Sequence, residues 1–510
     1  MKILGIDLGT TNSAVALVNQ HGVPEIIQNR EGDYVTPSVV FFDRTEAIVG
    51  RVAKHSATLD PSNLVQCVKR EMGNREWRFH PSSGGEFSPE SISSLILRRL
   101  KEDAEMMCGE KFTHAVISVP AYFADPERQA TRDAAEMAGL TPVRIINEPT
   151  AAALAYGLGS TASEERVVVY DLGGGTFDVS VLKITPDAVQ VLGIGGDRRL
   201  GGVDWDNAIM KWLADQFAAD GGQRLLDAAS PGSGAEEELR EKAELAKHAL
   251  SQMRQTKVVL SAGNSHKTVT LTRDAFEGFT SGLLKQTQFT LENVVREAGL
   301  RWRDISKILL VGGSTRMPAV AEMVQRVSGL TPSREVHPDE AVALGAAVQA
   351  ALYTGAGVTR METGIKEVTV TDVTAHSLGV KLFDKIKKES YNQIVVDRGT
   401  KLPTKVEGWS LQTINENQTR WDAELTQGED RELKYVKVIG SGQIDFMGAK
   451  PAGYPLRLDV EYDIDGIIHA FVFDGNTGAK FGELHITRES NLSPGELAAM
   501  KQRVGGLALG

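Results

Sequence analysis

The chain has 510 residues and a formal net charge of −11 at pH 7, with acidic and basic residues interspersed and no Lys/Arg-rich block. This length predicts about two to four domains, and the charge pattern argues against nucleic acid as the principal partner. The two cysteines, Cys67 and Cys108, disfavour a disulfide framework and favour a reducing compartment. A strand-like run begins at Lys2 and leaves no room for a signal peptide, and the apolar run 341–353 is shorter than the roughly 20 residues of a membrane span. We therefore expect a cytoplasmic chain with no membrane partner.

The first predicted element is a strand, turn and strand over residues 3–17, ILGIDLGTTNSAVAL. A near duplicate follows at residues 167–184, VVVYDLGGGTFDVSVLKI, with Asp171 in the place of Asp7. A Gly-rich bend between β-branched runs is by itself an ordinary hairpin turn, and Asp is common in such turns. The second copy favours another interpretation, a duplicated unit whose two bends face each other.

Residues 308–318, ILLVGGSTRMP, again combine a strand, a pair of glycines and a helix start. Glycines let backbone N–H groups converge on an anion, threonine hydroxyls add donors, and an aspartate at a strand end can hold hydrated Mg²⁺ beside phosphate oxygens. The three segments therefore predict phosphate-binding loops. Asp7 and Asp171 suit the metal, and the candidate phosphate ligands are Gly9, Thr10, Thr11, Gly173, Gly174 and Thr176.

Strands alternate with helices through the first 355 residues. The strand HAVISVPAYF precedes the helix DPERQATRDAAEMAGL, in which Asp125 suits the N-cap, Pro126 the first helical position and Gly139 the stop. This alternation predicts an α/β architecture with a parallel or mixed sheet. The Ala/Gly-rich run 341–353 is expected to form a closely packed helix.

The helix predicted at residues 236–253, EEELREKAELAKHALSQM, has two distinct faces. One face is an apolar stripe that we expect to be buried, formed by Leu239, Ala243, Ala246, Leu250 and Met253. Glu244, Lys247 and Ser251 step by three and four along another face. Periodicity alone assigns this second set to solvent.

Beyond residue 371 the helical period disappears. Residues 456–464 alternate apolar and polar, break at Asp465-Gly466 and resume as IIHAFVF, which predicts an antiparallel β-domain over 372–487. The Gly- and Thr-rich segment 356–371 is predicted to be a linker. Ser493 and Glu496 have the spacing of a capping box, so a short helix should run to Val504 within a C-terminal stub at 488–510.

Seven motifs resemble, in order, those of the seventy-kilodalton heat-shock chaperone family of bacterial type. The resemblance spans residues 1–355 and extends more loosely into the β-domain. It implies an actin-like α/β ATPase domain of duplicated ribonuclease-H-like lobes, an antiparallel β-sandwich that binds substrate, and a lid that is absent or truncated. Sugar kinases and filament-forming actin relatives share such a cleft, but the linker and β-domain argue against both. The motifs are GIDLGTTNS at 5–13, VPAYF at 119–123, INEPTAAALAYG at 146–157, DLGGGTFDVS at 171–180, LGGVDWD at 200–206, VGGSTRMP at 311–318 and HPDEAVALGAA at 337–347.

The resemblance also implies roles for individual residues. ATP or ADP, Mg²⁺ and K⁺ are the expected cofactors, with Asp7 and Asp171 holding Mg²⁺ through water. The implied catalytic residues are Lys69, Glu148, Asp171, Thr176 and Asp178. The implied nucleotide contacts are Asp7, Gly9, Thr10, Thr11, Asn12, Gly173, Gly174, Gly175, Gly201, Gly202, Glu244, Lys247, Ser251, Gly312, Gly313, Ser314, Arg316 and Asp339. Without the resemblance, Lys69 would be interpreted as a solvated helix lysine.

The same resemblance implies that ATP controls the β-domain. The coupling residues are Pro120, Arg128, Arg144, Asn147 and Asp372, of which the last three respond to a J-domain cochaperone, and a nucleotide-exchange factor is the second expected partner. The linker run 368–372, VTVTD, has threonines where the family has mostly leucines. Each such change removes on the order of 1–2 kcal/mol of docking burial as an upper estimate, so we expect weaker coupling. Its strand propensity still allows addition to a sheet edge.

The β-domain leaves two functions open. By resemblance, the peptide contacts are Val380, Phe383, Trp421 and Ala423. Trp421 falls where a small aliphatic residue normally lines the central pocket, so its indole would obstruct or reshape it; a register error is the alternative, because residues 406–419 align poorly. The first function is a stress-response chaperone that binds unfolded polypeptide segments, and the short lid predicts fast release. The second is an ATP-controlled scaffold whose β-domain binds a dedicated protein.

Overall fold

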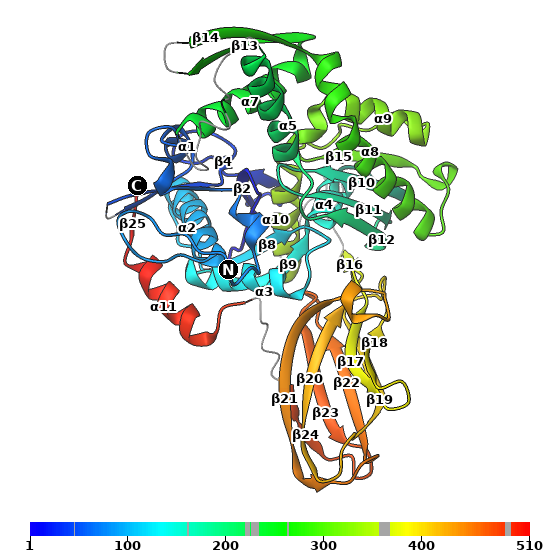
Figure 1. Cartoon of the computed structure of the whole chain (residues 1–510). Coiled ribbons are helices and arrows are strands. Elements are labelled where there is room, and N and C mark those ends of the chain that lie inside the picture. The colour runs from blue at the N-terminus through cyan, green and yellow to red at the C-terminus, as the bar shows by residue number, and fades with distance from the viewer. Residues whose placement is uncertain are drawn as a thin grey trace.

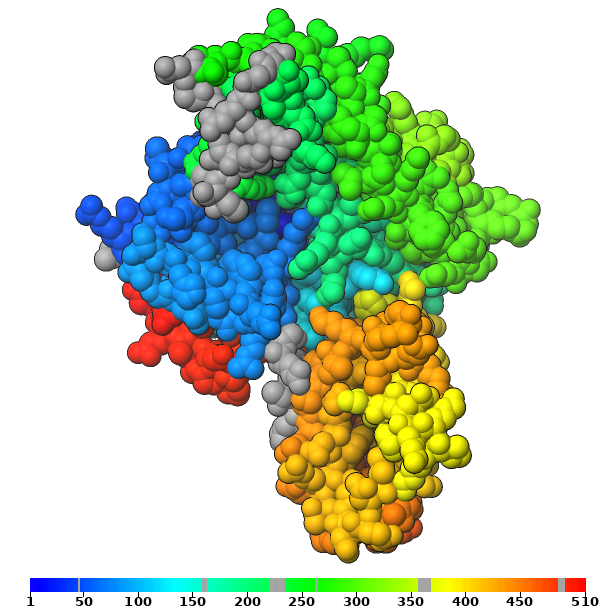
Figure 2. Space-filling model, in the orientation of Figure 1, coloured from blue at the N-terminus to red at the C-terminus, as the bar shows by residue number. Residues whose placement is uncertain are grey.

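The computed structural model of the protein describes residues 1–44, 46–160, 163–219, 225, 234–262, 265–355, 368–484 and 491–510. A large α/β part carries a β-sandwich that projects from one end, and the last helix lies back against the α/β part (Figure 1). The space-filling view shows the same division, with the β-sandwich as a separate projection (Figure 2). Most of the predicted linker, residues 356–367, lies outside the described residues.

Two mixed sheets, each built around one of the two predicted hairpins, form the centre of the α/β part. The first has the order β3 (Pro24–Ile26), β2 (Asn12–Val18), β1 (Leu4–Asp7), β8 (His114–Val119) and β9 (Thr141–Asn147), with β4 (Thr36–Pro37) beside β2. The second has the order β15 (Lys307–Val311), β10 (Glu165–Leu172), β11 (Phe177–Ile184), β12 (Ala188–Asp197) and β16 (Thr369–Thr371). In each sheet the predicted hairpin is antiparallel and its first strand has a parallel neighbour on the other side. The sheets therefore confirm the duplication that the two hairpins predict.

Helices α4 (Glu148–Ser160) and α10 (Ala341–Thr354) pack closely against each other. A Cβ atom added to Gly345 would lie 1.7 Å from the carbonyl oxygen of Ala151, and one added to Gly5 would lie 2.1 Å from the amide nitrogen of Ala347. These approaches exclude any side chain at either glycine. The close packing that was predicted for the Ala/Gly-rich helix is confirmed.

The remaining elements of the α/β part surround this centre (Figure 1). The helices are α1 (Arg51–His55), α2 (Pro89–Cys108), α3 (Asp125–Met137), α5 (Gly202–Ala218), α7 (Gly234–Gln252), α8 (Arg273–Glu297) and α9 (Pro318–Ser328). Short 3₁₀ helices are η1 (Pro61–Asn63), η2 (Val68–Glu71), η3 (Trp302–Asp304) and η4 (Gly313–Arg316). The outer strands are β5 (Val39–Asp43), β6 (Glu46–Val49), β7 (Leu64–Gln66), β13 (Gln255–Ala262) and β14 (Ser265–Thr272).

The β-sandwich consists of two antiparallel four-stranded sheets. One has the order β18 (Glu389–Val396), β17 (Leu378–Asp384), β20 (Gln418–Gln427) and β21 (Lys437–Lys450), and the turn η5 (Leu433–Tyr435) precedes β21. The other has the order β19 (Thr404–Gln412), β22 (Pro455–Tyr462), β23 (Ile468–Asp474) and β24 (Lys480–Glu483). Alternate residues of both sheets are buried between them, as the period-two pattern predicts.

Two segments that flank the β-sandwich in sequence pack on the α/β part. Strand β16, from the Thr-containing run, pairs in parallel with β12, so the predicted addition to a sheet edge is present. Helix α11 (Pro494–Gly505) begins with the predicted capping box of Ser493 and Glu496. It packs on α2 and α3, where Met500 and Val504 are buried, and β25 (Ala508–Leu509) then pairs with β6.

Two local predictions are wrong. The N-cap of α3 is Ala124, whose amide donates to the Glu127 carboxylate, and Asp125 is already helical. Met253 is 51% exposed rather than part of the buried stripe, because α7 ends at Gln252. The predicted stop of α3 at Gly139 is confirmed by its φ of +72°.

Candidate functional site

The bends of the two duplicated hairpins meet face to face. A Cβ atom added to Gly174 would lie 2.4 Å from Cγ2 of Thr11, and one added to Gly175 would lie 2.4 Å from Cγ2 of Thr10. Only glycine permits this approach, so the three-glycine run is explained by contact with the first loop as well as by turn geometry. The predicted opposition of the two bends is confirmed.

Gly201 and Gly202, where α5 begins, pack beside the second bend. Gly202 and Val203, at the start of α5, donate their backbone N–H groups to the carbonyl oxygens of Gly173 and Gly174 at 2.9 and 2.8 Å. A Cβ atom on Gly201 would lie 2.6 Å from the carbonyl carbon of Gly174. Loops from both sheets and the N-terminus of α5 therefore meet at one place.

One cation lies among four carboxyl groups below these loops. Lys69, in η2, donates from Nζ to Oε1 of Glu148 at 2.5 Å, and both side chains are buried. Asp7, Asp171 and Asp178 come from the ends of the duplicated strands. Exclusion of water and the charge of Glu148 raise the pKa of Asp7 to about 7 and that of Asp178 to about 8, and they also raise the pKa of Asp171. Four carboxyl groups against one lysine leave this site short of positive charge.

Hydrogen bonds from the end of β8 orient two of these carboxylates. Ser118 Oγ donates to Oδ1 of Asp7 at 2.8 Å, and the Tyr122 amide donates to Oδ1 of Asp178 at 3.0 Å. Sequence reasoning missed both donors. The sequence marks these two residues only by their position on either side of Pro120, where a predicted strand ends.

Residues of the third loop close one side of the site. Gly312 has φ +81°, and a Cβ atom there would lie 2.7 Å from Oδ1 of Asp171. Ser314 Oγ donates to the Gly173 carbonyl at 2.9 Å. Arg316 pairs with Asp339 at 2.6 Å on the exposed rim, and a Cβ atom on Gly313 would lie 2.9 Å from that aspartate.

The polar face of α7 points into the protein, contrary to periodicity alone. Lys247 is buried and donates from Nζ to Asp206 at 2.7 Å and to the Gly202 carbonyl at 3.1 Å. Glu244 pairs with Lys54 of α1 at 2.7 Å, which links the two sides of the cleft. Ser251 Oγ donates to the Lys247 carbonyl at 3.1 Å.

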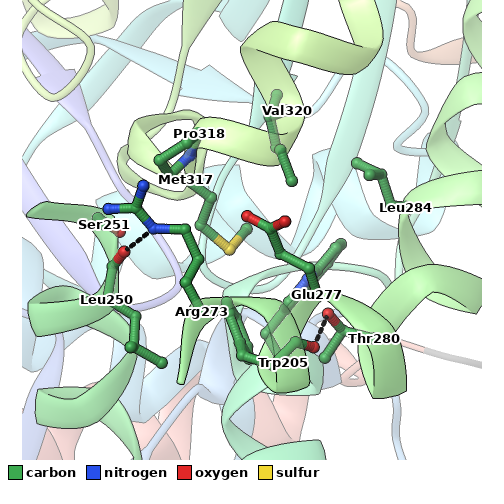
Figure 3. A pocket seen from close by; sticks show the side chains of 12 residues that line it. Trp205, Leu250, Ser251, Arg273, Glu277, Thr280, Leu284, Met317, Pro318 and Val320 are labelled. Atoms are coloured by element: carbon green, nitrogen blue, oxygen red, sulfur yellow. Dashed lines mark hydrogen bonds between the residues drawn. The ribbon is translucent and has the colours of Figure 1, made fainter. Parts of the chain in front are cut away.

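Next to Ser251 is an apolar pocket between α5, α7, α8 and α9 (Figure 3). Arg273, the first residue of α8, donates from Nε to the Leu250 carbonyl at 2.8 Å, which holds its guanidinium beside Ser251 (Figure 3). Trp205, Met317 and Val320 supply apolar walls. A planar group placed against Ser251 would contact the Arg273 guanidinium. No sequence pattern indicated that Arg273 lies at this pocket.

Three of the five predicted coupling residues, Arg128, Asn147 and Asp372, form one buried hydrogen-bond network. Arg128 donates to Oδ1 of Asn147 at 2.6 Å and to the Asp465 carbonyl at 3.2 Å, while Asn147 donates to Asp372 at 3.0 Å. Thr150, in α4, donates to the same Asp372 oxygen at 2.8 Å. Pro120 lies at the start of the turn that leads to α3, where its carbonyl accepts from the Phe123 amide.

Asp465 is the centre of a second contact that the sequence showed only as a turn. Its carboxylate pairs with Arg132 at 2.6 Å and with Arg144 at 3.4 Å, and it accepts from the Ile145 amide at 3.0 Å. Asp125 accepts from the Ile468 amide at 3.0 Å in the reverse direction. The turn between β22 and β23 is therefore fixed to α3 and β9 of the α/β part.

The far end of the β-sandwich contains a cavity of about 800 Å³. Phe383 and Trp421 line it, together with Tyr391, and Phe383 is 43% exposed. The other two predicted substrate residues, Val380 and Ala423, are buried in the sandwich core and do not line it. Trp421 shares the inward face of β20 with Ala423, but it lies where that face opens into the cavity.

No group of three or more His, Cys, Asp or Glu side chains in the described ranges is arranged to hold a metal by itself. Within the same ranges, no helix combines the length and apolar character that a membrane crossing requires.

Residues 3–81 and 76–506 match the family model described as Hsp70 protein. Because these matches cover nearly the whole chain, the protein belongs to the 70 kDa heat-shock protein family. Members of this family are ATPases that bind ATP and ADP, and the family suggests ATP-dependent chaperone activity.

The raised pKa of Asp178 predicts a pH-dependent stability. Burial and the charge of Glu148 raise this pKa from 3.8 to about 8, so the folded chain holds a proton that the unfolded chain releases between these values. Stability from this group is therefore present at low pH and is lost as the pH rises through about 8. In Asp178→Asn the side-chain amide oxygen can still accept from the Tyr122 amide, but the carboxyl group that titrates is removed. The melting temperature of the nucleotide-free variant should fall less between pH 6 and pH 9 than that of the unaltered chain; an identical fall would contradict the assignment.

Proposed function

We propose that the protein is an ATP-dependent chaperone that binds and releases extended polypeptide segments under the control of ATP hydrolysis. The observation that carries the proposal is a chain of buried contacts from the carboxylates to the β-sandwich. The Tyr122 amide donates to Asp178, and Arg128 donates to the carbonyl of the next residue, Phe123. Arg128 also donates directly to the Asp465 carbonyl and to Asn147, which donates to Asp372. An actin-like ATPase domain over 1–355, a linker over 356–371, a β-sandwich over 372–487 and a lid stub over 488–510 are part of this proposal.

The site residues fit a nucleotide with Mg²⁺. The bends present backbone without side chains at Gly173, Gly174 and Gly175, which suits phosphates, and the four carboxyl groups around Lys69 favour a divalent cation. Asp7 and Asp171 would hold the ion, which ordinarily keeps several waters. When bound, it would neutralise charge on the phosphate oxygens. K⁺ is proposed only as an additional ion.

Hydrolysis in this site requires positioning rather than a covalent step. Lys69 is held by Glu148, so its ammonium has one fixed direction near the γ-phosphoryl position. Glu148 and Asp178 would orient the attacking water. Burial and the charge of Glu148 raise the pKa of Asp178 to about 8, which suits this carboxylate to accept the proton of the water. Thr176 lies at the end of the second bend, where its hydroxyl can donate to the same water or to a phosphate oxygen.

The β-sandwich cavity is the proposed peptide site. Phe383, Trp421 and Tyr391 supply aromatic surface, and charged side chains such as Lys381 and Glu424 surround it. A J-domain cochaperone would act at Arg144, Asn147 and Asp372, and a nucleotide-exchange factor would open the cleft between Lys54 and Glu244. We further propose a cytoplasmic location and a role in the stress response, which the two free cysteines support.

A second function is favoured by Trp421 itself. The indole is partly packed on the core and borders the cavity, so it reduces the space for a client side chain. An ATP-controlled scaffold that binds one dedicated protein on this surface would need no deep pocket.

Lys69→Ala tests the proposed hydrolysis. Loss of the buried ammonium should lower ATP turnover by about 10²–10³-fold, because one preorganised charge-stabilising donor contributes that much, while ATP binding is retained. Lys111 follows the end of α2 and its side chain is 85% exposed. Lys111→Ala is therefore the control, and this variant should hydrolyse ATP normally. Turnover is measured as ADP formed and binding by calorimetry. Unchanged turnover in Lys69→Ala would remove the assigned role.

Trp421→Val separates the two functions. A fluorescent extended peptide is titrated against the unaltered chain and the variant, each with ATP and with ADP. Tight binding by the unaltered chain that ATP weakens supports the chaperone, whereas binding only after the substitution supports the scaffold. Trp409→Val removes another half-buried indole of the same sandwich, outside the cavity, and should not change peptide binding.

A further inference from the structure

A second large cavity, of about 690 Å³, lies on the side of the catalytic residues that faces the β-sandwich. Its walls come from the loop after η2, the start of α3, the loop after β12 and the first residues of β21. Both halves of the α/β part and the β-sandwich thus contribute to it. Its volume lies within the range of ligand-binding pockets.

This cavity adjoins the position of the γ-phosphoryl group. Lys69 lines the cavity and also donates to Glu148 in the catalytic cluster. Tyr122 and Gly196 line it as well, and each touches Asp178: the Tyr122 amide donates to the carboxylate, and a Cβ atom on Gly196 would lie 2.9 Å from Oδ1. The cavity and the catalytic site therefore share a wall at three residues.

Basic side chains outnumber carboxylates among the lining residues, but three of the basic side chains are paired with carboxylates outside the lining: Lys69 with Glu148, Arg70 with Asp204 at 2.5 Å and Arg75 with Glu496 at 3.0 Å. Six basic side chains face three carboxylates, Glu76, Glu127 and Asp197. The basic side chains are Lys69, Arg70, Arg75, Arg198, Arg199 and Lys437.

The basic residues differ in how firmly they are paired. Arg198 and Lys437 both contact Glu127, the latter at 3.5 Å. Arg199 has its nearest carboxylate, Glu71, at 3.9 Å, and its side chain is 73% exposed. Arg199 is therefore free to exchange that distant partner for a passing anion.

The nucleotide side of the cleft is bridged by side chains. Lys54 pairs with Glu244 at 2.7 Å and Gln66 donates to Glu237 at 2.7 Å, which joins α1 and β7 to α7. Helices α1 and α7 lie toward the end of the α/β part opposite the β-sandwich (Figure 1). With ADP still bound, a cleaved phosphate would meet bridging side chains on that side and a wide space with the loosely paired Arg199 on the other.

We propose that the cavity is the exit route of inorganic phosphate, with Arg199 as its outer anion contact and Lys437 and Val438 of the β-sandwich as part of its wall. The proposal rests on the proposed ATPase function. In that reaction the bond between the γ-phosphorus and the bridging oxygen of ADP breaks, a bond to the water oxygen forms, and orthophosphate, ADP and a proton result. The cavity changes no bond; it conducts the orthophosphate away, and the docked β-sandwich shapes the path.

The experiment is a single turnover of MgATP followed in two ways. Acid quenching measures ADP formed, and a fluorescent phosphate-binding protein measures phosphate in solution. Arg199→Glu reverses the outer charge, and Val438→Trp adds bulk to the wall from a side chain that is 39% exposed. Both should leave ADP formation unchanged and slow phosphate release about fivefold to tenfold, since charged clefts alter ion rates by roughly 10-fold or more. The effect of Arg199→Glu should shrink as ionic strength rises.

Matched controls are Arg301→Glu and Val259→Trp, at sites that are similarly exposed and remote from the cavity, and in both release should remain normal. Release that keeps pace with ADP formation in both cavity variants would overturn the exit route while leaving the ATPase intact. ADP formation slowed by the same factor as release would also overturn it. Absence of ADP formation by the unaltered chain would overturn the proposed function and the exit route together.

Discussion

The close approach of two glycine bends is the constraint on which the rest of the structure depends. Thr10 and Thr11 fill the space that side chains at Gly175 and Gly174 would need. Because each bend is fixed by its own antiparallel hairpin, their contact also fixes the two sheets relative to each other. Asp7, Asp171 and Asp178 are brought together as a consequence, and their crowding is offset within the described chain by Lys69.

Short, buried contacts join the β-sandwich to this carboxylate cluster. Tyr122 holds Asp178 by its amide, and three residues further the turn enters α3, whose Arg128 binds the β-sandwich at Asp465. Asp372 fixes the segment after β16 to Asn147 and Thr150. A shift of one sheet against the other would strain several of these bonds at once. The contacts of the β-sandwich and the carboxylate cluster therefore share a boundary.

Local features could be predicted from the sequence, and long-range ones could not. The hairpins, the helix stop at Gly139 and the capping box at Ser493 depend on neighbouring residues, so their patterns are visible in the chain. Asp465 looked like an ordinary turn residue because its partner Ile145 is 320 positions away. Alternation in β20 showed which residues share a face, but not that Ala423 lies in the core while Trp421 lies where the face opens. The inward direction of Lys247 likewise depends on Asp206, a partner from another helix.

The central claim is that the two bends must touch to form the nucleotide site, and Gly174→Ala tests it most directly. The added methyl group would lie 2.4 Å from Thr11, so the bends must separate. Calorimetric titration with MgATP should show binding weakened by at least about tenfold, or roughly 1.4 kcal/mol. Gly282→Ala, on an open face of α8, should bind as the unaltered chain does. Equal affinity in Gly174→Ala and the unaltered chain would contradict the account.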